Sequence, residues 1–222
     1  MQRVASELAQ PATAFVERVR PRLGLRWCTP TTELQLCGHG TLAAGCVVLR
    51  QTGLEVVRFS TPGGDADVSV AGELFELEFP RRLYEPATNH QLAAALGVVD
   101  VATGVSGDDW LMEVATPEEV VDCTPDLSRV ERLARSAVIT APGGEDAAIT
   151  SRVFAPAIGI PEDQVTGSAH SGLATWWNAR LGSDFYAYQA SARGGRIRLR
   201  LSEHGVRLAG RAEIVGSGFL AR

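Results

Sequence analysis

The chain has 222 residues, of which 45% are hydrophobic, and a formal net charge of -5 at pH 7. This composition supports a substantial core, and the negative charge provides no global field that would attract nucleic acid or an anionic membrane. The longest apolar run, 42–49, is much shorter than the roughly 20 residues of a membrane span. The N-terminus lacks the apolar segment of a secretion signal, so we expect a cytoplasmic protein.

The first part of the chain is predicted to fold as strands around one long helix. Residues 1–10 have the apolar spacing of a helix, and glycines bound a second helix at 38–53. Alternating apolar residues predict strands at 13–17, 24–28, 54–60, 66–71 and 73–79. The proline-bounded stretch 80–86 breaks this pattern. We therefore predict an N-terminal lobe at 1–82, with 213–222 returning to it.

The remaining residues, 83–212, are predicted to form a C-terminal lobe of similar type. Helical spacing occurs at 90–96, 126–135 and 167–182. Strand patterns occur at 98–103, 111–115, 136–140, 185–190, 196–201 and 205–210, and one more strand is expected at 213–218, in the segment that returns to the N-terminal lobe. The stretch 141–148 combines glycine, proline and acidic residues, which favours a surface loop.

Two of the predicted helices, 38–53 and 167–182, repeat one design. Each opens with glycine and a hydrogen-bonding side chain, His39 or Ser168, and each stops at glycine. Internal repetition at this scale predicts two similar halves. The start of a helix presents unpaired N–H groups and the positive end of the helix dipole, which together can hold an anion. If the halves face each other, the two helix starts bracket one cleft.

Two titratable residues beside these helix starts are candidates for acid–base chemistry. Asp163 lies a few residues ahead of the second helix, and His39 lies at the start of the first. Moving a proton between carbons of a small carboxylate needs a base, an acid, and donors that hold the carboxylate and the developing enolate. The N–H groups of Gly38 to Gly40 and of Gly167 to Ala169 could be those donors. The alternative is structural: Asp163 then organises its turn and His39 is a local hydrogen-bonding group.

The cysteines and histidines do not have the spacing of a metal site or a disulfide framework. Proton transfer between Asp163 and His39 would require neither a metal nor a coenzyme. Cys37 precedes a helix start, where a thiolate would be stabilised, although a buried neutral thiol is the other interpretation of its position.

Several motifs resemble one known family. They are LRWCTPTTELQL (25–36), CGHGTLAAG (37–45), SRVFAPAIGIPEDQVTGSAHSGLATWW (151–177) and YQASARGGRIRL (188–199). In order and in combination they resemble the phenazine-biosynthesis PhzF family, which is related to diaminopimelate epimerase. The resemblance implies an α+β fold of two pseudo-symmetric lobes, each a curved, mostly antiparallel sheet around a central helix, with the active site between them. It also implies a homodimer and isomerisation or epimerisation of a small carboxylate by proton transfer without a coenzyme.

Individual residues match the family's functional positions. His39 matches the histidine of its Cys-Gly-His motif, Asp163 the aspartate of its Glu-Asp-Pro-Val-Thr-Gly-Ser motif, and Ser168 the serine of that motif. The resemblance implies that Asp163 and His39 are catalytic. It also implies that the substrate is held at the helix starts by Gly38, Gly40, Gly167, Ser168 and Ala169.

Two departures from the family pattern support a second hypothesis. Ala12 stands where the family has a proton-transferring glutamate, so the chain is alternatively a non-catalytic ligand-binding protein that has kept the cleft. The sequence also begins at a helix, whereas family members begin with a pair of strands. Either Met1 is a late start or the N-terminal lobe is short of its first strands.

Overall fold

The computed structural model describes residues 1–19 and 22–219 and divides the chain into two compact units. Unit 1 is Met1–Glu78 together with the segment that begins at Ala209, and unit 2 is Phe79–Leu208. The sequence predicted that the chain passes from one lobe to the other at 82/83 and at 212/213. In the structure the chain passes between the two units within the strands Leu74–Phe79 and Val206–Gly210, and not in the proline-bounded stretch.

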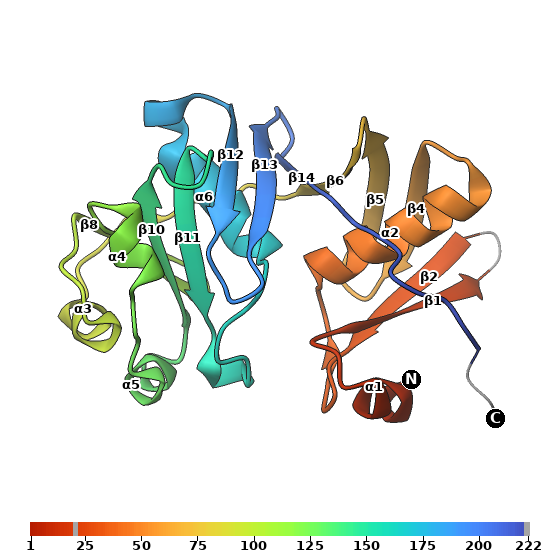
Figure 1. Cartoon of the computed structure of the whole chain (residues 1–222), viewed down its shortest axis with the longest axis horizontal. Helices are drawn as coiled ribbons and strands as arrows, with labels where there is room; N and C mark the ends of the chain where they lie inside the picture. The colour runs from red at the N-terminus through yellow and green to blue at the C-terminus, as the bar shows by residue number, and fades with distance from the viewer. Residues whose placement is uncertain (20–21, 220–222) are drawn as a thin grey trace. The chain divides into compact units, whose positions relative to one another are not determined.

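Unit 1 is a mostly antiparallel sheet with one long helix (Figure 1). Its helices are α1 (Gln2–Leu8) and α2 (Gly38–Thr52). Its strands are β1 (Thr13–Val19), β2 (Arg22–Cys28), β3 (Glu33–Leu34), β4 (Val56–Thr61), β5 (Gly64–Ala71) and β6 (Leu74–Phe79). The strand order is β1-β2-β4-β5-β6, with β3 paired to β2. Among the strand pairs of the described part of this unit, β2–β4 alone is parallel, because α2 carries the chain across between these two strands.

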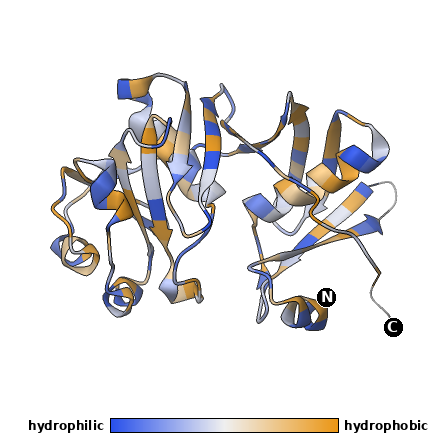
Figure 2. Cartoon of the chain, in the orientation of Figure 1, coloured by the Kyte–Doolittle hydropathy of each residue, from blue (hydrophilic) through white to orange (hydrophobic). Residues whose placement is uncertain are grey.

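Helix α2 packs against β1, β4 and β5 through a face of small and apolar residues. Ala44, Cys46 and Leu49 are buried on this face, and Figure 2 shows hydrophobic colouring along the middle of the helix. Gly45 permits the close approach to the sheet, since a Cβ there would lie 2.5 Å from Cγ1 of Val68 on β5. The helix ends at Gly53, whose φ of 72° is readily adopted by glycine and whose N–H donates to the Leu49 carbonyl.

Unit 2 is a larger, mostly antiparallel sheet with helices packed on it. Its helices are α3 (His90–Leu96), α4 (Pro117–Val121), α5 (Leu127–Arg132), the 3-10 turn η1 (Pro156–Ile158) and α6 (Gly167–Leu181). Its strands are β7 (Glu85–Pro86), β8 (Ala102–Ser106), β9 (Asp109–Glu113), β10 (Ser136–Pro142), β11 (Ile149–Phe154), β12 (Asp184–Gln189), β13 (Gly195–Leu201) and β14 (Val206–Gly210). The order is β14-β13-β12-β11-β10-β9-β8-β7. The pairs β9–β10 and β11–β12 are parallel.

The same connectivity occurs once in each unit. In unit 1, the hairpin β1–β2 leads through α2 to β4, which is parallel to β2 and antiparallel to β5. In unit 2, the hairpin β10–β11 leads through α6 to β12, which is parallel to β11 and antiparallel to β13. Both helices contain 15 residues. The expected α+β fold with a repeated, mostly antiparallel sheet around a central helix is confirmed.

Some predicted elements are corrected. The strand expected at 213–218 is absent from the described chain: Arg211–Phe219 has no regular secondary structure, and Val215 and Phe219 are fully exposed. Alternation supplies strand propensity, but a strand forms only where another strand accepts its hydrogen bonds.

Strand β11 was missed because its buried run has no alternation, which is typical of strands covered on both faces. The short helix α4 was also missed, although Thr116 and Glu119 form a capping box.

The contact between α2 and β5 makes Gly45→Ala a test of the packing in unit 1. Alanine in an exposed helix is favoured over glycine by about 1 kcal/mol, but here the added methyl group overlaps Val68. We expect the free energy of unfolding to fall by roughly 1–3 kcal/mol, measured by urea denaturation. In a Val68→Gly background, which removes both the methyl groups and the Cβ that lies 2.6 Å away, the same substitution should be neutral or stabilising. Stabilisation in the native background would contradict this packing.

Candidate functional site

The start of α2 is fixed by tight packing but is not capped by a side chain. Cys37 is the residue before the helix, with an extended φ of -149°, and no side chain accepts from the first N–H groups. The Trp27 ring lies against Gly40: a Cβ at Gly40 would be 2.8 Å from Cδ1 of Trp27 and 2.9 Å from Sγ of Cys37. The N–H and the hydroxyl of Thr41 both donate to the Cys37 carbonyl. The N–H groups of Gly38, His39 and Gly40 therefore remain available to a ligand.

Cys37 and His39 are in contact at this helix start. Sγ of Cys37 lies 3.5 Å from Nε2 of His39, so a proton can pass between the thiol and the imidazole. Cys37 is buried, whereas His39 is exposed. The imidazole ring of His39 is therefore accessible to solvent, and the thiol of Cys37 is buried next to it.

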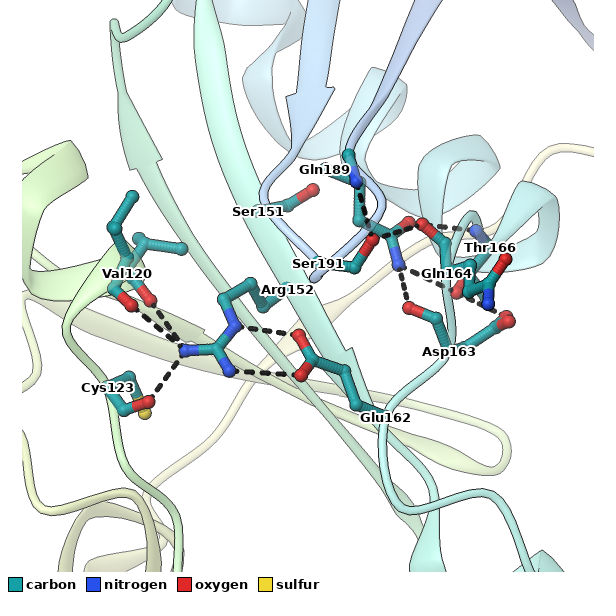
Figure 3. A network of polar contacts seen from close by, with 12 residues as sticks. Val120, Cys123, Ser151, Arg152, Glu162, Asp163, Gln164, Thr166, Gln189 and Ser191 are labelled. Atoms are coloured by element: carbon teal, nitrogen blue, oxygen red, sulfur yellow. Dashed lines mark hydrogen bonds and ion pairs between the residues drawn. The ribbon is translucent and has the colours of Figure 1, made fainter.

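The start of α6 in unit 2 corresponds to the start of α2 in unit 1, and it lies beside Asp163 (Figure 3). Thr166 precedes the helix, and its hydroxyl donates to Oδ2 of Asp163 at 2.6 Å instead of accepting from a helix N–H. The Thr166 hydroxyl therefore binds the carboxylate and does not cap the helix. The backbone N–H of Asp163 donates to the Val153 carbonyl on β11, which ties the segment to the sheet.

A buried glutamine organises this turn. Gln189 lies at the end of β12 and is fully buried. Its Oε1 accepts from the N–H of Thr166 at 2.8 Å. Its Nε2 donates to the Asp163 carbonyl at 2.7 Å and to the Thr166 hydroxyl at 3.3 Å. One side chain thereby holds both residues that lead into α6.

His170 supports the same helix start from within the core. Its Nδ1 donates to the Thr166 carbonyl at 2.8 Å, and its Nε2 lies 3.2 Å from the Ser151 hydroxyl, which acts as the donor when the ring is neutral. Burial lowers the pKa of His170 from 6.5 to about 4. The ring is therefore a neutral structural link between β11 and α6 at pH 7.

Glu162, the residue directly before Asp163, is part of an ion pair. Arg152 donates to Glu162 through Nε at 2.7 Å and Nη2 at 3.0 Å. Its remaining nitrogen, Nη1, donates to the carbonyls of Val120, Val121 and Cys123. Figure 3 shows this network beside the Asp163 turn. Glu162 is thus a structural partner and not a free carboxylate.

The structure groups the predicted site residues into two sets. Unit 1 brings together Cys37, Gly38, His39 and Gly40, and unit 2 brings together Asp163, Gly167, Ser168 and Ala169. The two sets belong to different units, so the expectation that they flank one cleft stays a prediction. Gln189 and His170 were missed as supports, although both lie within motifs that carried the family resemblance.

The capping pattern distinguishes these two helices from α3, α4 and α5. Those three helices are capped by side chains, those of Asn89, Thr116 and Asp126. Helices α1, α2 and α6 are not, and of these three α2 and α6 are the long ones, with 15 residues each. Uncapped N–H groups at the start of a long helix are suited to binding an anion such as a carboxylate.

Residues 1–19 and 22–219 contain no group of three or more His, Cys, Asp or Glu residues that could hold a metal ion. No helix among them is long and apolar enough to cross a membrane.

The comparison with known proteins decides the family. The family model described as phenazine biosynthesis-like protein matches residues 1–218. The chain belongs to this family. It is 39% identical to an uncharacterized isomerase of Pseudomonas aeruginosa, over 98% of this chain and 85% of the relative. It is 35% identical to an uncharacterized isomerase of Halalkalibacterium halodurans, over 97% of this chain and 84% of the relative.

Solved structures of the family share the fold. A PhzF family protein of Enterococcus faecalis superposes with a TM-score of 0.90 at 33% identity, covering 97% of this chain and 84% of that one. A putative phenazine biosynthesis protein of Clostridium difficile gives a TM-score of 0.91 at 31% identity, covering 100% of this chain and 87% of that one. The PhzF resemblance predicted from the motifs is therefore confirmed.

The buried His170 predicts how stability depends on pH. The unfolded chain binds a proton on this histidine below about pH 6.5, whereas the folded chain does so only near pH 4. The free energy of unfolding should therefore fall as the pH is lowered from 7 to 4, by roughly 3 kcal/mol for this group. The measurement is urea denaturation across this range, with His170→Gln as comparison. The variant should show a flatter pH dependence, and equal slopes would refute the assignment.

Proposed function

We propose that the chain catalyses the isomerisation or epimerisation of a small carboxylate-containing metabolite by proton transfer without a coenzyme. Asp163 and His39 are the proton-transferring groups. The observation that carries the proposal is that both repeated helices begin without a side-chain cap beside a titratable side chain. The names of the relatives, which include isomerases, support the same reaction class.

The proposed chemistry uses the helix starts as anion holders. The first helical bonds run from Thr41 to Cys37 and from His170 to Thr166. The preceding N–H groups, on Gly38 to Gly40 and Gly167 to Ala169, are free to bind the substrate carboxylate and the enolate that forms as a proton leaves carbon. One side chain removes the proton and the other delivers a proton to the resulting carbanion.

Cys37 offers a different assignment of the proton-transferring group on unit 1. The contact between its thiol and the His39 ring allows the imidazole to hold the proton while the thiolate acts on carbon. A thiolate at this place would also be favoured by the positive end of α2.

Ala12 supports the second candidate, a ligand-binding protein without turnover. This residue directly precedes β1 and has no group that can exchange a proton. It stands where the family resemblance implies a glutamate, so loss of chemistry with retention of carboxylate binding is the physical alternative.

Deuterium exchange tests the leading proposal. The full chain is incubated in heavy water with a panel of small amino and hydroxy acids, and NMR follows the loss of carbon-bound protons. We expect exchange with at least one acid, and a fall of about 10²-fold or more in Asp163→Asn and in His39→Gln, because each removes one proton-transferring group. His90→Gln is the control, since this exposed histidine lies at the start of a capped helix.

Exchange that persists in the double variant Asp163→Asn, His39→Gln would contradict the proposal, as would no exchange with any acid. Cys37→Ala assigns the group on unit 1. Retained exchange leaves the role with His39, and loss of exchange together with rapid, substrate-protected alkylation of the native chain assigns it to the thiol.

Substitution of Ala12 tests the ligand-binding alternative. If that alternative holds, the native chain binds a carboxylate in calorimetry but shows no exchange, and Ala12→Glu gains exchange because it supplies the absent acid–base group. Ala12→Gln is the matched control, with similar size and no titratable proton. Exchange by the native chain would exclude this alternative, whatever the variants do.

A further inference from the structure

We propose that Gln189 is a positioning residue that acts through Thr166 to orient the carboxylate of Asp163. The inference rests on the proposed function for its kinetic consequence, but its structural part can be tested without activity. Its basis is a chain of hydrogen bonds from Gln189 to Thr166 and from Thr166 to Asp163 (Figure 3).

The orientation of the Gln189 amide is determined by its partners. Its Oε1 faces the N–H of Thr166, which can only donate. Its Nε2 faces the carbonyl of Asp163, which can only accept. Rotating the amide by half a turn would place donor against donor and acceptor against acceptor. Since Gln189 is fully buried, no water can relieve such a mismatch.

The amide in turn fixes the direction of the Thr166 hydroxyl proton. Nε2 of Gln189 donates to Oγ1 of Thr166, so the single proton of this hydroxyl is left to point at Oδ2 of Asp163. In the described residues Oδ1 of Asp163 has no hydrogen-bond partner. Oδ1 is therefore the oxygen that exchanges a proton with the substrate, and Oδ2 is the oxygen that holds the carboxylate in place.

The turn that contains Asp163 is held on three sides. The N–H of Asp163 binds β11, its carbonyl binds Gln189 of β12, and the carbonyl of Thr166 accepts from His170 of α6. With the backbone fixed, the Thr166 contact determines the remaining rotation of the side chain. Since a misplacement of about 1 Å in a reacting group can cost on the order of 10²-fold in rate, orientation by Gln189 has a measurable effect.

Four variants test the proposal with the exchange assay. Gln189→Met removes the amide at similar length, Thr166→Val removes the hydroxyl at similar shape, and Thr166→Ser keeps the hydroxyl. We expect kcat for exchange to fall by about 10–100-fold in the first two with little change in KM, and to stay within a few-fold of native in Thr166→Ser. Ser191→Ala is the control. It removes a bond to the Gln164 carbonyl in the same region, and should lower the melting temperature without slowing exchange.

Equal rates for Thr166→Val and the native chain, where Asp163→Asn is inactive, would overturn this inference and leave the proposed function intact. If the native chain shows no exchange, the proposed function fails, and crystal structures of native and Thr166→Val proteins still decide the positioning role. The Asp163 carboxylate should turn away from residue 166 in the variant. An unchanged carboxylate would overturn the inference. If Gln189→Met does not fold, the Thr166 variants still test the hydrogen bond to Asp163.

Discussion

The start of a helix leaves backbone N–H groups without partners inside the helix, and the rest of the candidate site depends on how this chain deals with them. Helices α3, α4 and α5 satisfy the requirement with a side chain. Helices α2 and α6 do not. The hydroxyl of Thr166, the residue before α6, instead binds Asp163. The absence of a side-chain cap at these two helices leaves each start able to hold an anion beside a group that can exchange a proton.

Close packing is what keeps these open helix starts in place. Gly40 lies against Trp27 in unit 1, and Gly167 lies against Phe79 in unit 2, where a Cβ would be 2.8 Å from the phenyl ring. In unit 2 the buried groups of Gln189 and His170 add hydrogen bonds from two neighbouring elements. A buried polar network with all its partners in place rigidifies a site, and this one surrounds the Asp163 carboxylate, which we propose transfers a proton.

The sequence allowed the repeated helices to be predicted because glycine marks both ends of each, and Asp163 and His39 stood out because they lie beside those ends. The supports could not be found this way. Gln189 is 26 residues beyond Asp163 in number and reaches it only through the pairing of β12 with β11. The ion pair of Glu162 was equally hidden, because its partner, Arg152, lies on a strand whose sequence shows no alternation. The predicted strand at 213–218 failed for the opposite reason, since local pattern cannot supply a pairing partner.

The most direct measurement of the central claim is an NMR titration of the amide groups at the two helix starts. A small carboxylate that undergoes exchange is added to the ¹⁵N-labelled full chain, and the shifts of Gly38 to Gly40 and of Gly167 to Ala169 are followed. The account predicts that both sets move together with a single dissociation constant. Shifts confined to one helix start, or to neither, would contradict it.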